Sequence, residues 1–277
     1  MTTAAPAELL RQARHNGYAI GAFNAVNLET AQAIVAAAEA ERAPVILQVS
    51  ENAARYAGLQ PLLALGQSLK AAAAVPVVLH FDHAESFESA VAALEAGFDS
   101  VMLESGDLRP EEYARRLRRL ADSAHDRGAS VEGEFEIVSK ASREGKGLPL
   151  EALPGLIAAA GCDTVCVAIG SEHKMRAKTA GLDLVRLERI AELVPQPLVL
   201  HGSSGVKEDD LRRCVRLGIA KVNLATELMS VFTTAVRTAL ADDAVNDPRR
   251  YLGAARDAMT ARVRAYIRLL GSAGRAD

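Results

Sequence analysis

The sequence predicts a (β/α)8 TIM barrel with additional C-terminal helices. Eight short runs of β-branched and apolar residues recur along the chain and are nearly continuous in hydrophobicity, as strands buried on both faces are. Amphipathic helical stretches separate these runs, which favours a closed parallel sheet. The first run leads into GAFNAVN, which lacks the Gly-rich dinucleotide turn usual after the first strand of an open doubly wound sheet.

The eight runs are the predicted strands of the barrel wall. They cover residues 18–26, 44–50, 75–84, 99–105, 129–136, 162–170, 196–205 and 220–227.

The stretches between the runs carry helix start and stop signals. In the second predicted helix, Ser86 can cap the N-terminus, Glu88 lies in the first turn and Gly97 marks the end. The others begin with acidic residues or Pro110, or are rich in Ala. The predicted helices cover 28–43, 86–97, 109–128 and 207–218, with a further helical region from about residue 228 that contains a loop at 242–251.

Length and composition predict one domain over residues 1–277. A chain of 277 residues with 49% hydrophobic residues can bury a large core, and no linker or low-complexity stretch divides it. The formal net charge of −3 gives no basic patch, so we expect no nucleic-acid partner. We also expect no membrane partner, because no window resembles a signal or a span. Three cysteines fit the reducing cytoplasm, where we expect the protein.

Reactive side chains gather at the ends of the predicted strands. The third strand ends in His80, Asp82 and His83, the sixth runs out to His173, and the seventh ends in His201. In a TIM barrel the C-terminal strand ends form the active site. Three imidazoles around an open position are a common arrangement for catalytic zinc, although other imidazole-binding metals fit as well. We therefore predict a metal site.

Within the third strand, neighbouring residues should point to opposite faces. Asp82 and His83 can both reach the rim only if the chain turns at the strand end. His80 shares the face of Asp82, so it can orient a ligand or the carboxylate, or serve as a buried structural residue.

Two small-residue segments predict a phosphate site. The segment HGSSG supplies Gly202, Ser203 and Ser204, and NLAT supplies Asn223 and Thr226. The loops after the seventh and eighth strands of such barrels usually bind phosphate, and small residues let the backbone wrap an anion.

The fifth strand places Glu132, Glu134 and Glu136 on one face. Inside a barrel, carboxylates are costly unless they meet a metal or an ion-pair partner. We expect at least Glu134 to lie near the metal. A metal, a phosphate site and Asp82 together suggest chemistry beside a carbonyl, in which a divalent cation polarises a ketone oxygen and a carboxylate moves protons.

The motifs resemble those of the class II, metal-dependent ketose-bisphosphate aldolases, closest in pattern to the tagatose- and fructose-1,6-bisphosphate aldolases. The similarity runs in order over nearly the whole chain. It rests on AFN (22–24), PVILQVS (44–50), LHFDHAES (79–86), VEGE (131–134), VAIGSEH (167–173), LVLHGSSG (198–205), KVNLATE (221–227), NDPRRY and GSAG.

The resemblance implies a role for each matching residue. It makes His83, His173 and His201 the zinc ligands, Asp82 the proton donor to the aldehyde oxygen, and Glu134 the carboxylate of an alternative metal position. A monovalent cation, Na+ or K+, accompanies the phosphate in many members, and a homodimer or homotetramer is the family expectation. The residues implied to bind substrate are Asn24, Ser50, Gly202, Ser203, Ser204, Asn223, Leu224, Ala225, Thr226 and Arg249, the last reaching a second phosphate across a dimer.

The sequence departs from the family pattern at three places. The stretch FEIVSKASREGKG lacks the usual Gly-Gly and acidic loop that carries the base for the C3 proton. Glu144 can replace that base, and Glu136 is the weaker candidate. Lys174 stands where a Gly usually follows the metal-binding His; its N–H or its ammonium can serve the phosphate. The fourth strand reads MLESGD, so Glu104, Ser105 and Asp107 can reshape the aldehyde side.

The resemblance thus implies an aldolase that reversibly cleaves a fructose- or tagatose-type ketose 1,6-bisphosphate to dihydroxyacetone phosphate and glyceraldehyde 3-phosphate. Two alternatives stay open. One is a divergent member with another aldehyde or with a specialised aldol or isomerase reaction. The other is a non-catalytic partner subunit, against which the intact Asp82 and histidines argue.

Overall fold

Eight parallel strands close into a barrel, as the sequence predicts. The structure, a computed structural model, describes residues 5–135, 148–171 and 178–276. Each strand pairs with the next in parallel, and β1 pairs with β8 to close the sheet. The strands are β1 (Ile20–Asn24), β2 (Val45–Ser50), β3 (Val77–Ala84), β4 (Ser100–Leu103), β5 (Ser130–Glu134), β6 (Thr164–Cys166), β7 (Leu198–Leu200) and β8 (Ile219–Leu224).

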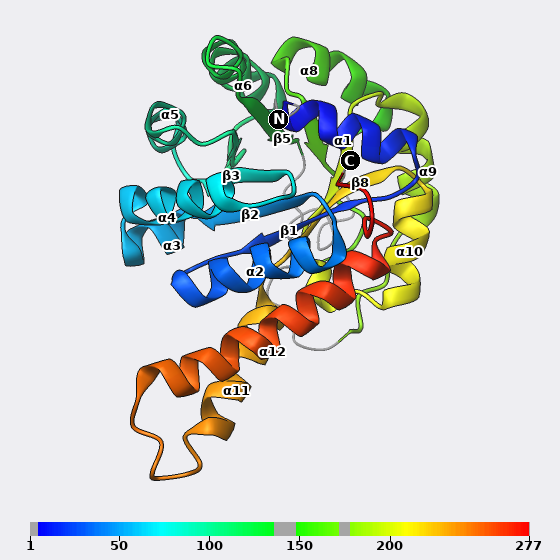
Figure 1. Cartoon of the computed structure of the whole chain (residues 1–277). Helices are drawn as coiled ribbons and strands as arrows, with labels where there is room; N and C mark the ends of the chain where they lie inside the picture. The colour runs from blue at the N-terminus through cyan, green and yellow to red at the C-terminus, as the bar shows by residue number, and fades with distance from the viewer. Residues whose placement is uncertain (1–4, 136–147, 172–177, 277) are drawn as a thin grey trace.

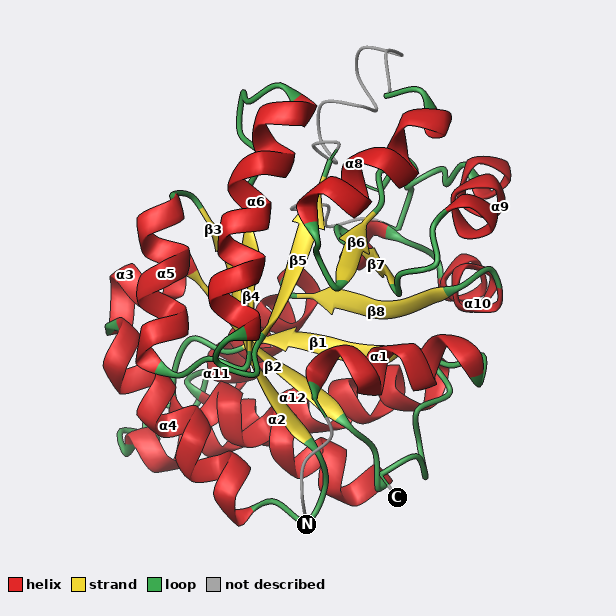
Figure 2. Cartoon of the chain, turned by 90° about the horizontal axis from the view of Figure 1, so that it is seen from above, coloured by secondary structure: helices red, strands yellow, loops and turns green. Residues whose placement is uncertain are grey.

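Helices surround the barrel on its outside (Figure 2). They are α1 (Pro6–His15), α2 (Leu28–Glu41), α3 (Glu51–Ala57), α4 (Leu59–Ala72), α5 (Phe87–Ala96), α6 (Pro110–His125), α8 (Leu153–Ala160), α9 (Leu184–Leu193), α10 (Glu208–Arg216), α11 (Thr226–Ala239) and α12 (Pro248–Leu269), with 3-10 turns at Leu150–Ala152 and Ser203–Gly205.

The predicted helix signals take the roles that the sequence assigns them. Ser86 caps α5 by accepting a hydrogen bond from the Ser89 N–H, and Gly97 ends the helix in the left-handed region at φ 111°. Pro110 occupies the first turn of α6. These local signals fix where the helices begin and end, and therefore how the strands they connect line up.

The outer core lies between strands and helices, and the barrel interior is layered. Ile20, Ile46 and Val78 form the floor, where Leu10 of α1 packs against them and closes the N-terminal end of the barrel. Above the floor the inward-facing side chains become polar. This change places the chemistry in the upper half of the barrel, toward the C-terminal strand ends.

The additional C-terminal helices form an arm. In Figure 1, α11 and the first turns of α12 extend away from the barrel as a two-helix hairpin, while the rest of α12 returns along α2. Only Leu228 of α11 is buried. A groove of about 570 Å³ runs along the hairpin between side chains such as Val231, Ala235 and Ala254.

Candidate active site

The end of β3 turns, and this turn brings two neighbouring residues to the same rim. His83 adopts φ 56°, the left-handed region that non-glycine residues rarely occupy, and the pairing of β3 with β4 shifts between Phe81 and Ala84. Such strained positions occur where the surroundings impose them, commonly at functional sites. The predicted turn is therefore present, and Asp82 and His83 both line the pocket above the barrel.

Asp82, His83 and His201 form a candidate metal cluster. Each offers a ligand atom, and these atoms all lie within 4.8 Å of one another. The His83 and His201 rings face each other edge to face, with centroids 5.0 Å apart. Two imidazoles and a carboxylate are a donor set that fits zinc and other imidazole-binding divalent metals. His173, the third predicted imidazole ligand, lies outside the described residues.

Asp82 is buried and held by amides from two other strands. Asn24 of β1 donates to its Oδ2 at 3.4 Å, and Asn223 of β8 donates to its Oδ1 at 3.3 Å. Burial alone would raise the pKa of Asp82, but the facing His83 and His201 imidazoles outweigh it and lower the pKa to about 2. The carboxylate is therefore ionised and fixed in direction.

Glu104 orients His83. Its Oε1 accepts a hydrogen bond from the His83 Nδ1 at 2.9 Å, which directs the other ring nitrogen toward Asp82, 3.9 Å away. Burial lowers the pKa of His83, but the Asp82 charge and the Glu104 hydrogen bond raise it more, to about 9. Glu104 was expected only to reshape the aldehyde side. The sequence gives no sign of the contact between Glu104 and His83 except that Glu104 follows the last residue of β4.

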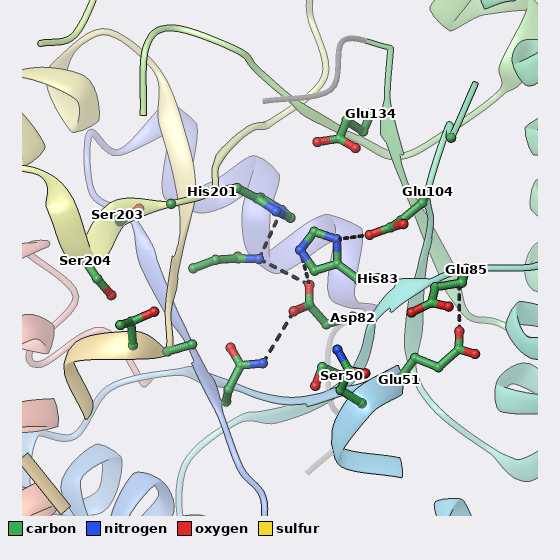
Figure 3. Close-up of a pocket in the computed structure, with 17 residues that line it drawn as sticks. Ser50, Glu51, Asp82, His83, Glu85, Glu104, Glu134, His201, Ser203 and Ser204 are labelled. Carbon is green, nitrogen blue, oxygen red and sulfur yellow. Dashed lines mark hydrogen bonds and ion pairs between the residues drawn. The ribbon is translucent and has the colours of Figure 1, made fainter. Parts of the chain in front are cut away.

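The pocket has a volume of about 510 Å³ and two different ends. Figure 3 shows Ser203 and Ser204 on one side of Asp82 and His83, and Glu51, Glu85 and Glu104 on the other. The lining residues are Asn24, Ser50, Glu51, Asn52, Asp82, His83, Glu85, Glu104, Gly106, Glu134, His201, Gly202, Ser203, Ser204, Asn223, Ala225 and Thr226.

The serine end of the pocket is a turn of small residues held by its own hydrogen bonds. Gly202 adopts φ 65° and leads into the 3-10 turn of Ser203–Gly205. The Ser203 hydroxyl donates to the Leu200 carbonyl at 3.1 Å, and the Ser204 hydroxyl accepts from the Glu227 N–H at 3.3 Å. These contacts hold a tight turn of small residues, and Gly202, Ser203 and Ser204 line the pocket.

The opposite end is acidic, which the sequence reasoning missed. Glu51 begins α3, and its Oε2 accepts from the Glu85 N–H at 2.6 Å and from the Ser89 hydroxyl at 2.9 Å. Arg55 pairs with both Glu51 and Glu85 at the rim. None of the described residues that line the pocket is Lys or Arg.

Comparison with known proteins identifies the family. The family model described as fructose-bisphosphate aldolase class-II matches residues 4–275. The chain belongs to the class II fructose-bisphosphate aldolase family. It is 41% identical to a fructose-bisphosphate aldolase of Geobacillus stearothermophilus, with 97% of each chain covered. It is 38% identical to one of Thermus caldophilus, covering 97% of this chain and 98% of the relative.

Solved structures agree with this family assignment. The YdjI aldolase of Escherichia coli K12 superposes with a TM-score of 0.88 at 28% identity, covering 99% of both chains. A protein described as a putative fructose-1,6-biphosphate aldolase from Coccidioides immitis gives 0.88 at 29% identity, covering 100% of this chain and 99% of that one. The class II aldolases are lyases and are generally metal-dependent, which accords with the cluster of Asp82, His83 and His201.

Most of the described residues implied by the class II pattern line the pocket, but Arg249 and Leu224 do not. Arg249 begins α12 on the arm, is exposed and pairs with Asp247. Glu144 and Lys174 lie outside the described residues. The Leu224 side chain packs into the outer core, so it can meet a substrate only through its backbone.

Glu132 and Glu134 both face the barrel interior in this class II aldolase. Glu134 lines the pocket, and its N–H donates to the Tyr113 hydroxyl at 2.9 Å. Glu132 lies one layer lower and meets His201 and Lys221 instead. An interior carboxylate was expected to need an ion-pair partner or a metal. For Glu132 that partner is Lys221, to which the sequence assigns no role.

No helix in the described part of the chain is long and apolar enough to cross a membrane.

Proposed function

We propose that this protein is a zinc-dependent aldolase that reversibly cleaves a ketose 1,6-bisphosphate, of fructose or tagatose type, to dihydroxyacetone phosphate and glyceraldehyde 3-phosphate. The observation that carries the proposal is the position of Asp82, held by Asn24 and Asn223 beside the His83 and His201 imidazoles in a pocket that Gly202, Ser203 and Ser204 also line. Family membership and the names of the relatives support it.

In this proposal His83, His173 and His201 hold the zinc, with Glu134 as an alternative ligand. The zinc supplies Lewis-acid stabilisation of negative charge at the ketone oxygen. Asp82 protonates the aldehyde oxygen in the condensation direction, and its fixed orientation suits that transfer. Glu144 removes the C3 proton.

The serine end takes the phosphate of dihydroxyacetone phosphate. Gly202, Ser203 and Ser204 present N–H groups from β7, and the segment from Asn223 to Thr226 does so from β8. Asn24 and Ser50 contact the substrate carbons, while Lys174 adds charge beside the phosphate. A monovalent cation, Na+ or K+, completes the site.

The test is a cleavage assay on fructose and tagatose 1,6-bisphosphates after chelation and after zinc is restored. We expect activity to disappear and return with about one zinc per chain. Full turnover by metal-free protein would exclude the metal mechanism, and isomerised but uncleaved substrate would favour the isomerase alternative. Zinc-loaded protein that cleaves no ketose phosphate would favour the partner-subunit alternative.

A second candidate keeps the dihydroxyacetone phosphate half and uses an aldehyde without a phosphate. The acidic end favours it, since Glu51, Glu85 and Glu104 surround that part of the pocket and would repel a second phosphate. Cleavage of a ketose 1-phosphate faster than the matching 1,6-bisphosphate would select this candidate. The reverse preference would require a cation at this end, either Arg55 released from its pairs with Glu51 and Glu85, Arg249 of another subunit, or a residue outside the described ranges.

We further propose a homodimer or homotetramer in the cytoplasm. The arm supports association, because α11 carries apolar side chains of which only Leu228 is buried. The three cysteines are free and buried, which suits a reducing compartment. Replacing Val231 with Glu on the arm should lower the mass measured by light scattering, while Val185→Glu, an exposed apolar position on α9, should not.

A further inference from the structure

A buried polar network crosses the barrel one layer below the pocket. Its central residue is Lys221 of β8, only 1% exposed, whose Nζ lies 2.6 Å from Glu132 Oε2 and 3.3 Å from His80 Nε2. The other Glu132 oxygen, Oε1, lies 2.7 Å from His201 Nε2. His80 Nδ1 lies 2.9 Å from the Ser100 hydroxyl. Five strands or strand ends are joined in this way.

The direction of each hydrogen bond follows from the chemistry of the groups. An ammonium only donates, so Lys221 donates to Glu132 and to His80 Nε2, and the His80 proton must be on Nδ1, toward Ser100. A carboxylate only accepts, so His201 carries a proton on Nε2. Asn223 Nδ2, 3.0 Å from the same Nε2, then directs its proton to Asp82 instead.

We infer that Glu132 and Lys221 are positioning residues that fix the ring orientation and tautomer of His201, so that its Nδ1 is the metal-binding nitrogen. The inference rests on the proposed role of His201 as a metal ligand. Carboxylates that accept the second N–H of a ligating histidine orient the ring and strengthen it as a ligand. Here the carboxylate comes from β5 and is itself held by an ammonium from β8.

A purely structural ion pair would not require this arrangement. Burying two charges costs free energy, and an apolar pair of similar volume often stabilises a core at least as well. Glu132 also uses each oxygen for a different partner, and one of the two is His201 at the metal cluster. Lys70 and Asp99 form the contrasting case, a partly exposed pair at 2.7 Å with no contact to the cluster.

The test compares zinc affinity, measured by chelator competition, in Lys221→Met and in the matched control Lys70→Met. We expect Lys221→Met to weaken zinc binding about 10-fold to 100-fold, because partners of metal ligands typically contribute this much. We also expect an altered visible spectrum of the cobalt-substituted protein. Lys70→Met should leave both unchanged.

A double variant keeps the test possible if the Lys221→Met protein does not fold. Glu132→Gln/Lys221→Met buries no charge, and we expect it to fold and to bind zinc at least about 10-fold more weakly than wild type. Wild-type affinity together with a wild-type cobalt spectrum in either folded variant would overturn the inference.

Side-chain ¹⁵N shifts of histidine in the wild-type, zinc-loaded protein test the tautomer without any variant. We expect the proton on His201 Nε2 and on His80 Nδ1, and a proton on His201 Nδ1 would overturn the inference. If the wild-type protein binds no zinc at all, the proposed function fails; normal zinc binding with unaffected variants refutes only the positioning role.

Discussion

His83 Nδ1 lies 2.9 Å from Glu104 Oε1, so a residue at the end of β4 sets the direction of an imidazole at the end of β3. This contact holds the ring of a residue whose backbone is already in the left-handed region. The side chain and the backbone of His83 are thus constrained by two different strands.

Removing the Glu104 carboxylate should weaken metal binding. We expect Glu104→Leu to raise the zinc dissociation constant about 10-fold to 100-fold, whereas Glu104→Gln, which keeps an acceptor for Nδ1, should lose less. Glu85→Gln is the control, since Glu85 lines the same end but pairs with Arg55. Chelator competition measures all three, and equal affinities would show that Glu104 does not support His83.

Asp82 should be needed for the reaction and not for metal retention. Asp82→Asn keeps the volume and removes the carboxylate, so we expect kcat for ketose bisphosphate cleavage to fall about 100-fold to 10,000-fold. Because the proposed zinc ligands are three histidines, zinc content, measured by elemental analysis, should stay near one per chain, and its loss would make the Asp82 carboxylate a ligand as well. A variant that retains full activity would remove Asp82 from proton transfer.

Metal binding should release a proton and weaken in acid. The pKa of His83 is raised to about 9, so the metal-free imidazole is charged at neutral pH and must lose its proton before it can bind a metal. Calorimetry in buffers of different ionisation enthalpy should detect the released proton at pH 7.5. Identical heats in all buffers would contradict a charged His83.

The stability of the metal-free protein should pass through a maximum near pH 6.5. The folded-state pKa of His83 lies above its unfolded value, so its contribution is fully present below pH 6.5 and is lost as pH rises to about 9. Burial and the Lys221 charge lower the pKa of His80 to about 3, so its contribution is lost as pH falls from 6.5 to 3. Each group changes the free energy of unfolding by at most about 1.4 kcal/mol per pH unit. Denaturant unfolding at a series of pH values measures the free energy of unfolding. In the His83→Asn variant this free energy should no longer fall between pH 6.5 and 9.

Tyr113 should stabilise the fold through its hydroxyl, which donates to the Leu103 carbonyl at 2.7 Å and accepts from the Glu134 N–H at 2.9 Å. Tyr113→Phe leaves both buried groups without this partner, so we expect a loss of about 1–3 kcal/mol in the free energy of unfolding. Tyr56→Phe, at an exposed tyrosine, should change it little. Equal unfolding midpoints for the two variants would refute the role of the Tyr113 hydroxyl.

The sequence predicted the strands and the polar rim of the barrel because both depend on local pattern. The run that ends in Asp82 and His83 contains both the apolar residues of a buried strand and its polar end within ten residues. Strand periodicity puts His80 on the same face as Asp82, and the two side chains lie 3.9 Å apart. Local pattern does not predict the partner of Glu132. Lys221 is 89 residues away, and the two meet only because the barrel closes with a particular register.

Other features were missed for related reasons. Lys221 precedes Asn223 by two residues in an apolar strand, so strand periodicity puts the two side chains on one face, and a pocket-lining Asn223 implies an inward-facing lysine. The acidic end had no comparable signal, because Glu51 and Glu85 belong to different strand ends and meet only across β2 and β3. The predicted roles of Glu144, His173 and Lys174 lie outside the described residues.

The two ends of the pocket are built from different parts of the chain, the serine end after β7 and β8 and the acidic end after β2, β3 and β4. Substitutions at Glu51 and Glu85 therefore leave the serine end and the histidines in place, whereas Glu104 also orients His83. If the serine end binds the dihydroxyacetone phosphate half, as proposed, mutations at the acidic end can change the aldehyde partner without changing how that half is bound. The loops after β2 and β3 are then the natural target for directed evolution of new carbon–carbon bond-forming catalysts.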